Sequence, residues 1–300
     1  MWLDIYVVAI VVAIACALPG VFLVIRGTTM LSDAITHSVL LGIVLGFFIT
    51  QDLNSPLLII GATVTGLIVV WIIEALQRTE LMSSDAAIGI TFPLFFSLGI
   101  ILITRYAGDV HLDTDSVLMG ELAFVPFSRV ELFGLDLGPE SLWTMLIILG
   151  LNILFIYLFY KELKVTTFDP IYAGVIGISP ALIHYGLMGL VSLTAVGAYD
   201  AVGSILVVGF MVGPALSAYL LTNDLKKMLG LAVLFATFNS IIGITAARYL
   251  DVSLAGMIAV VTGMTTFVVF LFSPNKGWIK QRIDHKKQKK AFEKWLETNH

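Results

Sequence analysis

The stretch that decides the fold is residues 5–25, which read IYVVAIVVAIACALPGVFLVI without a single charged side chain. A helix of about 20 apolar residues is long enough to cross the hydrocarbon core of a bilayer. No basic segment precedes this stretch, no small-residue cleavage pattern follows it, and it is longer than a signal-peptide core. We therefore predict a transmembrane helix at residues 5–25 of the mature protein.

The same search for runs without Asp, Glu, Lys or Arg finds eight more windows. They are 34–51, 53–73, 86–104, 141–160, 170–199, 201–223, 228–247 and 252–275. The window 170–199 exceeds one span and is interrupted by Pro180, so we expect one span plus additional structure there. The sequence predicts an all-α integral membrane protein with nine transmembrane helices over residues 1–275. Eight spans are the alternative, because two windows are short and only Asp200 separates the sixth from the seventh.

The composition agrees with a membrane protein. Of the 300 residues, 58% are hydrophobic and 13% are charged, against roughly 25% charged in soluble domains. A net charge of −4 leaves no basic excess that could bind phosphates. These values exclude a soluble globular enzyme, a disordered protein and a nucleic-acid binder. The single cysteine, Cys16, cannot form an intrachain disulfide.

Lysine and arginine placement predicts the orientation, because these residues accumulate on the cytoplasmic side of a membrane. The basic tail 276–300 is therefore expected in the cytoplasm, and nine spans then put the N-terminus outside. This topology places 14 of the 17 basic residues inside, with only Arg105, Arg129 and Arg248 outside. Trp278 and Trp295 among the lysines favour an interfacial helix on membrane lipid; a simple juxtamembrane tail is the alternative.

The loop 105–140 is external in this topology and carries seven acidic residues against two basic ones. Such a surface would raise the local cation concentration or bind a complementary partner, although a solvated loop explains it too. Asp109, His111, Asp113 and Asp115 alternate, so they would face one side of an extended strand. A cation-collecting patch and an ordinary surface loop both remain open.

The most informative polar group is Ser32-Asp33-Ala34-Ile35-Thr36-His37 in the second span. Residues four apart share a helix face, so Asp33 and His37 point the same way. A carboxylate with an imidazole is a ligand pair for a divalent transition metal, and polar groups in a membrane span mark ion paths by default. The alternative is that Asp33 caps the helix near Arg26 and His37 is a core histidine. Two ligands are incomplete; water, another helix or a second copy of the chain would supply the rest.

His184 lies early in the sixth predicted span, on the same side as Asp33. It would complete the metal site or hydrogen-bond locally. The chain contains no G-x-x-x-x-G-K-[ST] phosphate loop and no H-E-x-x-H metalloprotease motif. We therefore predict that it is not an enzyme and does not hydrolyse ATP itself.

The segment between the fifth and sixth spans predicts a short cytoplasmic helix at about residues 168–178. Thr167 or Asp169 would cap it, Pro170 would begin it and Gly177 would end it, before Pro180 starts the next span. A short, mostly apolar helix on this face is suited to a protein partner. A re-entrant or interfacial turn is the alternative.

Together these segments resemble the integral permease family of ATP-binding-cassette (ABC) importers for manganese, zinc and iron(II). The early-span motif, the cytoplasmic helix and a late-span signature occur in the family's order. The matching segments are Leu31 to Leu40, Phe168-Asp169-Pro170 with Ala173 and Gly177, and Val202 to Val208 with Pro214, Ala215 and Ala218.

The resemblance implies a fold similar to the vitamin B12 type of importer permease, with fewer spans. It implies a bacterial plasma-membrane permease, paired with a second copy or a related permease, above a dimer of cytoplasmic ABC ATPase subunits. It also implies an extracellular metal-binding protein that delivers the cargo.

In this family the Asp and His of the early span coordinate the ion. By matching position, the resemblance gives these roles to Asp33 and His37. The sequence around His184 also resembles that of a family histidine, which makes His184 a further candidate ligand. By the same resemblance Phe168, Asp169, Pro170, Ala173 and Gly177 form the coupling helix. No cofactor is expected; the metal, manganese first and then zinc or iron(II), is cargo. The alternative function is a secondary transporter driven by an ion gradient, with the same polar pair. It would need coupling charges in several spans, which this chain mostly lacks.

Overall fold

The computed structural model describes residues 2–52, 55–106, 122–132, 135–274, 276–280 and 282. Within these ranges, nine helices are long and apolar enough to cross a membrane. They are α1 (Trp2–Arg26), α2 (Met30–Thr50), α3 (Pro56–Gln77), α4 (Ser84–Tyr106), α6 (Glu140–Leu158), α9 (Pro180–Val202), α10 (Ser204–Leu221), α11 (Leu225–Leu250) and α12 (Leu254–Phe272). The expected multi-pass, all-α fold with nine spans is confirmed, and the alternative of eight spans is wrong.

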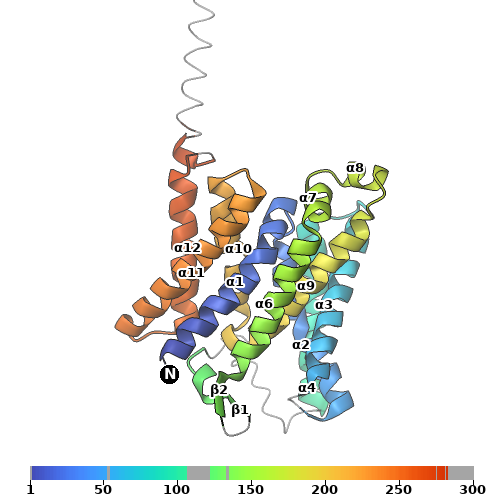
Figure 1. Cartoon of the computed structure of the whole chain (residues 1–300). Helices are drawn as coiled ribbons and strands as arrows, with labels where there is room; N and C mark the ends of the chain where they lie inside the picture. The colour runs from blue at the N-terminus through green and yellow to red at the C-terminus, as the bar shows by residue number, and fades with distance from the viewer. Residues whose placement is uncertain are drawn as a thin grey trace, which may run out of the picture.

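The remaining elements lie at the two ends of the bundle. At one end, the N-terminus lies near the antiparallel hairpin of β1 (Arg129–Leu132) and β2 (Leu135–Pro139), which follows the 3-10 turn η1 (Val125–Phe127). At the other end are α7 (Tyr160–Phe168), α8 (Pro170–Val175) and the end of α12 (Figure 1). We call these ends the hairpin side and the α8 side. Asp109, His111, Asp113, Asp115 and most of the tail 276–300 lie outside the described residues.

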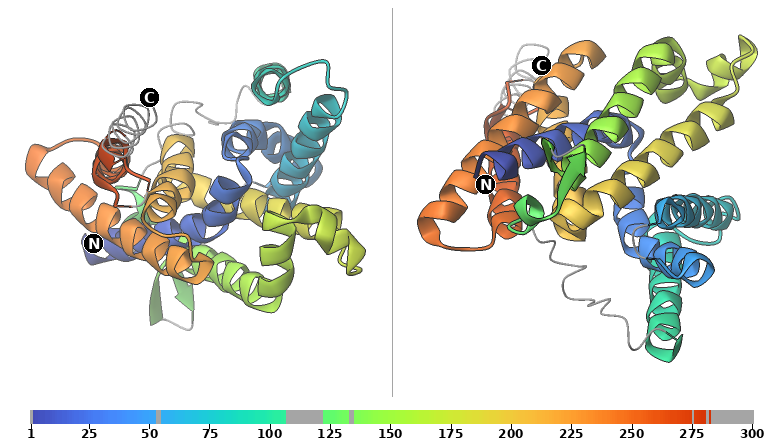
Figure 2. Two further views of the ribbon diagram at one scale, coloured as in Figure 1. Left: turned by 90° about the horizontal axis from the view of Figure 1, so that it is seen from above. Right: turned by 60° about the horizontal axis from the view of Figure 1, so that its bottom comes forward.

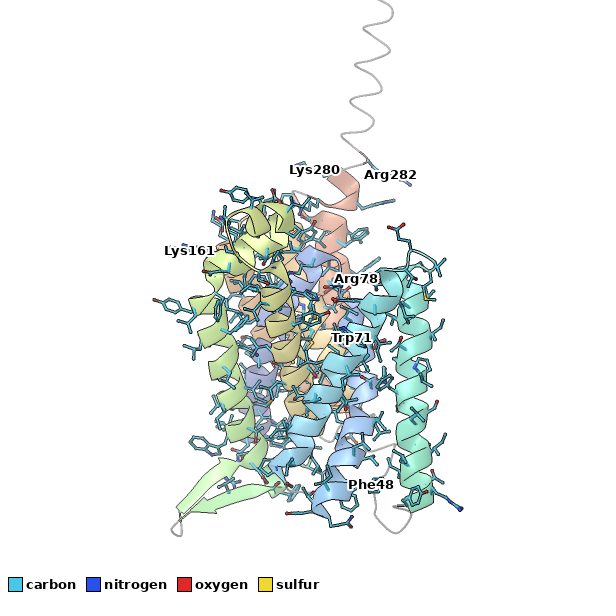
Figure 3. All side chains as sticks on the ribbon, turned by 90° about the vertical axis from the view of Figure 1, so that its right-hand side faces the viewer. Phe48, Trp71, Arg78, Lys161, Lys280 and Arg282 are labelled. Atoms are coloured by element: carbon cyan, nitrogen blue, oxygen red, sulfur yellow. The ribbon has the colours of Figure 1, made fainter. Side chains whose placement is uncertain are left out.

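Basic side chains gather at the α8 side. Figure 3 shows Arg78, Lys161, Lys280 and Arg282 at that end of the bundle, with Phe48 at the opposite end. The described arginines on the hairpin side include Arg129, which lies 3.5 Å from the Asp4 carboxylate at the start of α1. The asymmetry seen in the sequence is therefore an asymmetry between two ends of one bundle.

Helix α1 runs through the middle of the bundle and packs against α6, α9, α10 and α11. Its four alanines are fully buried, as are Val8, Val12 and Val21, and Cys16 is buried among them. On one side of α1 lies the group α10, α11 and α12, and on the other lies the group α2, α3 and α4, which α9 contacts (Figure 2).

Helices α2 and α3 approach each other most closely through glycine. A Cβ atom on Gly42 would lie 2.5 Å from the carbonyl oxygen of Gly61 on α3. Small residues let membrane helices come this close, which increases the van der Waals contact between them. The close contact joins α2, which carries Asp33 and His37, to α3 as one unit.

The boundary between the sixth and seventh spans differs from the expectation. The sequence windows were separated at Asp200, but α9 continues through that position to Val202. The break occurs at Gly203, whose φ of 76° lies in the left-handed region that favours glycine. A charged residue does not end a helix by itself, because its backbone still forms the helical hydrogen bonds.

Candidate functional site

Asp33 and His37 lie on one face of α2, as their spacing predicts. Asp33 is in the first turn of the helix, and His37 Nε2 lies 3.4 Å from Asp33 Oδ1. Both side chains are partly exposed, 38% for Asp33 and 27% for His37. The pair is therefore preformed on a helix surface and accessible from outside the chain.

The surroundings of the pair come from α2 and α4. The His37 ring packs against Phe92 and Phe96 of α4, with centroid distances of 5.6 and 6.2 Å. The hydroxyl of Thr36 donates to the backbone carbonyl of Asp33, within the helix itself. The aromatic rings limit the orientation of the imidazole and leave Nε2 directed toward the carboxylate.

The structure does not support the alternative interpretation of Asp33 as the N-terminal cap of α2. Thr29 occupies the N-cap position of α2, and Asp33 follows four residues later, inside the first turn. Arg26, the expected neighbour of Asp33, hydrogen-bonds instead to Thr166, Thr167 and His184. In the part of the chain that the structure describes, no group of three His, Cys, Asp or Glu side chains could hold a metal.

His184 lies in a separate polar cluster at the α8 side of α9. Its Nδ1 lies 3.1 Å from Nη1 of Arg26, and its Nε2 is hydrogen-bonded to Glu74 Oε1. Because a guanidinium can only donate, Nδ1 accepts and Nε2 carries the proton that Glu74 accepts. Both ring nitrogens therefore have partners, as in the local hydrogen-bonding interpretation. A metal ion would have to displace one of them, so the ligand role of His184 stays a prediction.

Glu74 is the functional candidate that the sequence interpretation missed. The third window was ended at Ile73 because a charged residue follows, whereas α3 continues to Gln77 and leaves the Glu74 side chain only 18% exposed. Tyr185 also donates to it, with its hydroxyl 2.9 Å from Oε2. The apolar Ala75 and Leu76 beyond Glu74 were the available signal that the helix continues.

Arg26 connects this cluster to α7. Its Nε donates to Thr167 Oγ1 at 3.1 Å, and its Nη2 donates to Thr166 Oγ1 at 3.2 Å. Thr166 and Thr167 belong to the last turn of α7, immediately before α8. Of the two expected caps for α8, Thr167 therefore binds Arg26, and the capping role belongs to Asp169.

Helix α8 lies within the range 168–178 where the sequence predicts a short helix, but it is shorter than predicted, and Phe168 ends α7 instead. Asp169 Oδ1 accepts a hydrogen bond from the Tyr172 backbone N–H at 2.8 Å, and Pro170 is the first helical residue. Gly177 follows the helix with a φ of 86°. Side-chain capping, a proline at the first position and a glycine after the last turn together define a six-residue helix.

The α8 helix presents an apolar surface to the outside of the bundle. Ile171 and Val175 are 82% and 80% exposed, whereas Ala173 is fully buried. Phe168 and Tyr172 are exposed beside them. Figure 1 shows that this helix projects at the end of the molecule, away from the sides of the spanning helices. We call Phe168, Ile171, Tyr172 and Val175 the α8 surface.

A groove of about 870 Å³ adjoins the α8 surface at Phe168. The groove is formed by α7 and the turn between α10 and α11, and three lysines line it. The lining residues are Tyr160, Lys161, Lys164, Phe168, Asn223, Asp224, Leu225 and Lys226. Burial and the nearby Asp224 carboxylate raise the pKa of Tyr160. The chemistry of the lining suits an acidic partner surface next to an apolar one.

The chain is similar to metal-transport membrane proteins along almost its whole length. It is 48% identical to the zinc transport system membrane protein TroD of Treponema pallidum over 94% of this chain and 76% of that protein. It is 43% identical to the manganese transport system membrane protein MntD of Bacillus subtilis over 91% of this chain and 92% of that protein.

Solved structures show the same fold. PsaBC from Streptococcus pneumoniae, in complex with Fab, matches with a TM-score of 0.77 and 31% identity over 93% of this chain and 94% of that one. A metal-chelate type ABC transporter in an inward-facing conformation shares the fold at a TM-score of 0.62 and 18% identity, over 89% of this chain and 84% of that one.

The family match covers residues 2–273, described as the ABC 3 transport family. This range contains all nine spanning helices of the described structure together with α7 and α8. The match and the two sequence relatives agree, and the chain therefore belongs to the ABC 3 transport family.

Proposed function

We propose that the chain is the transmembrane permease subunit of an ABC importer that moves a divalent transition-metal ion into the cytoplasm. Manganese is the first candidate for the cargo, followed by zinc and iron(II). The observation that carries the proposal is the preformed Asp33–His37 pair on a membrane helix of a chain whose relatives are named for manganese and zinc transport. Membership of an ABC family disfavours the alternative of a secondary transporter driven by an ion gradient.

In this function Asp33 and His37 are metal ligands. A carboxylate oxygen and a neutral imidazole nitrogen bind Mn²⁺, Zn²⁺ and Fe²⁺ alike, so the selectivity depends on ligand number and geometry. A second permease copy, related by a two-fold axis, would place another Asp33–His37 pair opposite the first and supply four ligands. The exposed fractions of both side chains support a site between two copies.

The energy source is a separate ABC ATPase subunit. The α8 surface, with Phe168 at its edge, is the contact that ATP binding and hydrolysis would move. Asp169 and Pro170 hold the start of the helix, Ala173 packs its inner face, and Gly177 ends it. The permease then performs no chemistry of its own and requires no cofactor.

The α8 side is cytoplasmic in this proposal. Basic residues gather there, and positive charge is characteristic of cytoplasmic segments. The hairpin side then faces outward, where an extracellular metal-binding protein would deliver the ion. The cytoplasmic tail 276–300 would lie near membrane lipid.

Elemental analysis of cells tests the function. The chain is expressed with its ATPase and binding protein, and Mn, Zn and Fe are measured in cells with wild type, His37→Ala or Asp85→Asn. Asp85 is an exposed carboxylate in the first turn of α4 and serves as the control. We expect one metal to accumulate with wild type and with the control, and to fall to background with His37→Ala.

Two results would contradict the proposal at different levels. If no metal differs between wild-type and empty cells, the chain is not a metal importer. If His37→Ala accumulates as much metal as wild type at equal membrane abundance, transport stands and the ligand assignment is wrong.

A further inference from the structure

Arg26, Glu74 and His184 form a polar cluster that the proposed function leaves without a role. The three residues lie on α1, α3 and α9, at the α8 side of the bundle. His184 binds Arg26 through Nδ1 and Glu74 through Nε2, so the imidazole bridges a cation and an anion. We call these three residues the bridging cluster.

The bonding of the cluster is directional. All three guanidinium nitrogens of Arg26 are hydrogen-bonded, two to the hydroxyls of Thr166 and Thr167 and one to His184. Glu74 accepts from His184 with one oxygen and from Tyr185 with the other. A connected and satisfied polar network in a partly buried site favours one relative placement of its members. Apolar packing allows more than one relative placement of the same helices.

The cluster lies between α8 and the candidate ligands. Thr166 and Thr167 end α7, directly before the Asp169 cap of α8. Arg26 ends α1, and only residues 27–29 separate it from α2, whose first turn contains Asp33. A movement of α7 and α8 therefore reaches the start of α2 through one guanidinium and one short turn.

A second connection reaches α2 through α3. His184 binds Glu74 on α3, and α3 is in close backbone contact with α2 at Gly42. Both connections start at the cluster and end on the helix that carries Asp33 and His37. Helices α2 and α3 are thereby both connected to the α7–α8 segment, α2 at its start and α3 at Glu74.

From these contacts we propose that Arg26, His184 and Glu74 are positioning residues that transmit the displacement of α8 to α2, so that ATP hydrolysis is coupled to movement at the metal site. The inference rests on the proposed function, because it requires that α8 contacts an ATPase. His184 acts here through both ring nitrogens and does not bind the ion.

The experiment measures ATP hydrolysis and Mn²⁺ uptake together, in proteoliposomes that contain the full complex. The main variant is His184→Leu, which removes both hydrogen bonds, and the matched variant is His184→Gln. The glutamine amide has a donating NH2 group and an accepting carbonyl oxygen, so it can replace the neutral imidazole between Glu74 and Arg26. A glutamine is a much poorer ligand than histidine for a transition metal.

We expect His184→Leu to lower Mn²⁺ uptake per ATP hydrolysed by about tenfold, which is typical of a lost coupling interaction. ATP hydrolysis itself should continue, and His184→Gln should restore most of the uptake. Thr167→Val, which removes a single hydrogen bond to Arg26, should give a smaller loss in the same ratio. Thr79→Val, at an exposed turn on the same side, is the control.

Each contrary result has a distinct meaning. If uptake and hydrolysis fall in parallel and the thermal midpoint of the complex drops, the cluster is merely structural and the inference fails. If Thr167→Val and His184→Leu both keep the wild-type ratio, the inference fails as well. If His184→Gln is as inactive as His184→Leu, the metal-ligand role of His184 replaces the positioning role. Failure of the wild-type complex to transport would instead overturn the proposed function.

Discussion

Two carboxylates illustrate how single charged residues are accommodated in the spanning helices. Asp33 lies in the first turn of α2, where the free backbone N–H groups and the helix dipole favour a negative charge. Glu74 lies near the opposite end of α3, where the dipole disfavours an anion. Hydrogen bonds from His184 and Tyr185 compensate for this unfavourable interaction with the dipole. The negative charge of Asp33 is therefore stabilised by its own helix, α2, and that of Glu74 by side chains of α9.

A prediction at the residue scale concerns Gly42. The Gly42→Ala variant places a Cβ 2.5 Å from the Gly61 carbonyl oxygen, so α2 and α3 must separate. We expect it to lower the free energy of unfolding by about 1–3 kcal/mol, the usual cost of overpacking. Thermal unfolding in detergent measures this change. The Gly150→Ala control on α6 has open space around its Cβ and should be neutral or stabilising. Equal midpoints for the two variants would contradict the prediction.

At the scale of the element, α8 depends on its ends more than on its length. A six-residue helix is too short to be stable alone, because helix nucleation is costly. Its Asp169 cap, Pro170 and buried Ala173 compensate for that shortness. The exposed apolar face can therefore be presented in one conformation at the end of the bundle.

The Asp169 cap provides the prediction at this scale. Asp169→Ala removes the hydrogen bond to Tyr172 N–H, which is worth roughly 1 kcal/mol of helix stability. We expect binding of the ATPase subunit to the purified permease to weaken about fivefold, as that free energy implies. Biolayer interferometry on immobilised permease provides the measurement. Asp169→Asn keeps a good capping residue and should bind like wild type. A loss of binding with both variants would assign Asp169 to a direct contact instead.

At the scale of the whole molecule, the hairpin and α8 lie on opposite sides of the membrane because a single span, α6, separates them along the chain. Within the described part of the chain, the nine helices make the N-terminus and the end of α12 lie at opposite ends. Under the proposed function, this arrangement would separate delivery of the ion at one face from the contact with the ATPase at the other.

Thiol labelling in intact cells tests the orientation. Cys16 is the single cysteine and is fully buried, so it is expected to remain unlabelled in wild type. A cysteine introduced as Ser128→Cys on the hairpin side should react with an impermeant maleimide, and one introduced as Leu81→Cys on the α8 side should react only after lysis. Both positions are exposed. The reverse pattern would place α8 outside the cell and contradict both the orientation and the proposed ATPase contact.

The sequence by itself determined the features that depend on neighbouring residues. The nine spans follow from apolar runs, because a helix satisfies its backbone hydrogen bonds within one segment. The shared face of Asp33 and His37 follows from the helical repeat, and the short helix α8 follows from Pro170 at its start and Gly177 after its end. In each case the relevant residues are a few positions apart.

Only the tertiary structure decided which polar groups meet. His184 is 158 residues from Arg26 and 110 residues from Glu74 along the chain, and no local pattern pairs them. These contacts depend on the packing of α1, α3 and α9. Glu74, which limits the apolar window 53–73 in the sequence, becomes a hydrogen-bond partner of His184 in the structure. The physical reason is that a largely buried charge is stable only where hydrogen-bond partners meet it, and here those partners come from other helices.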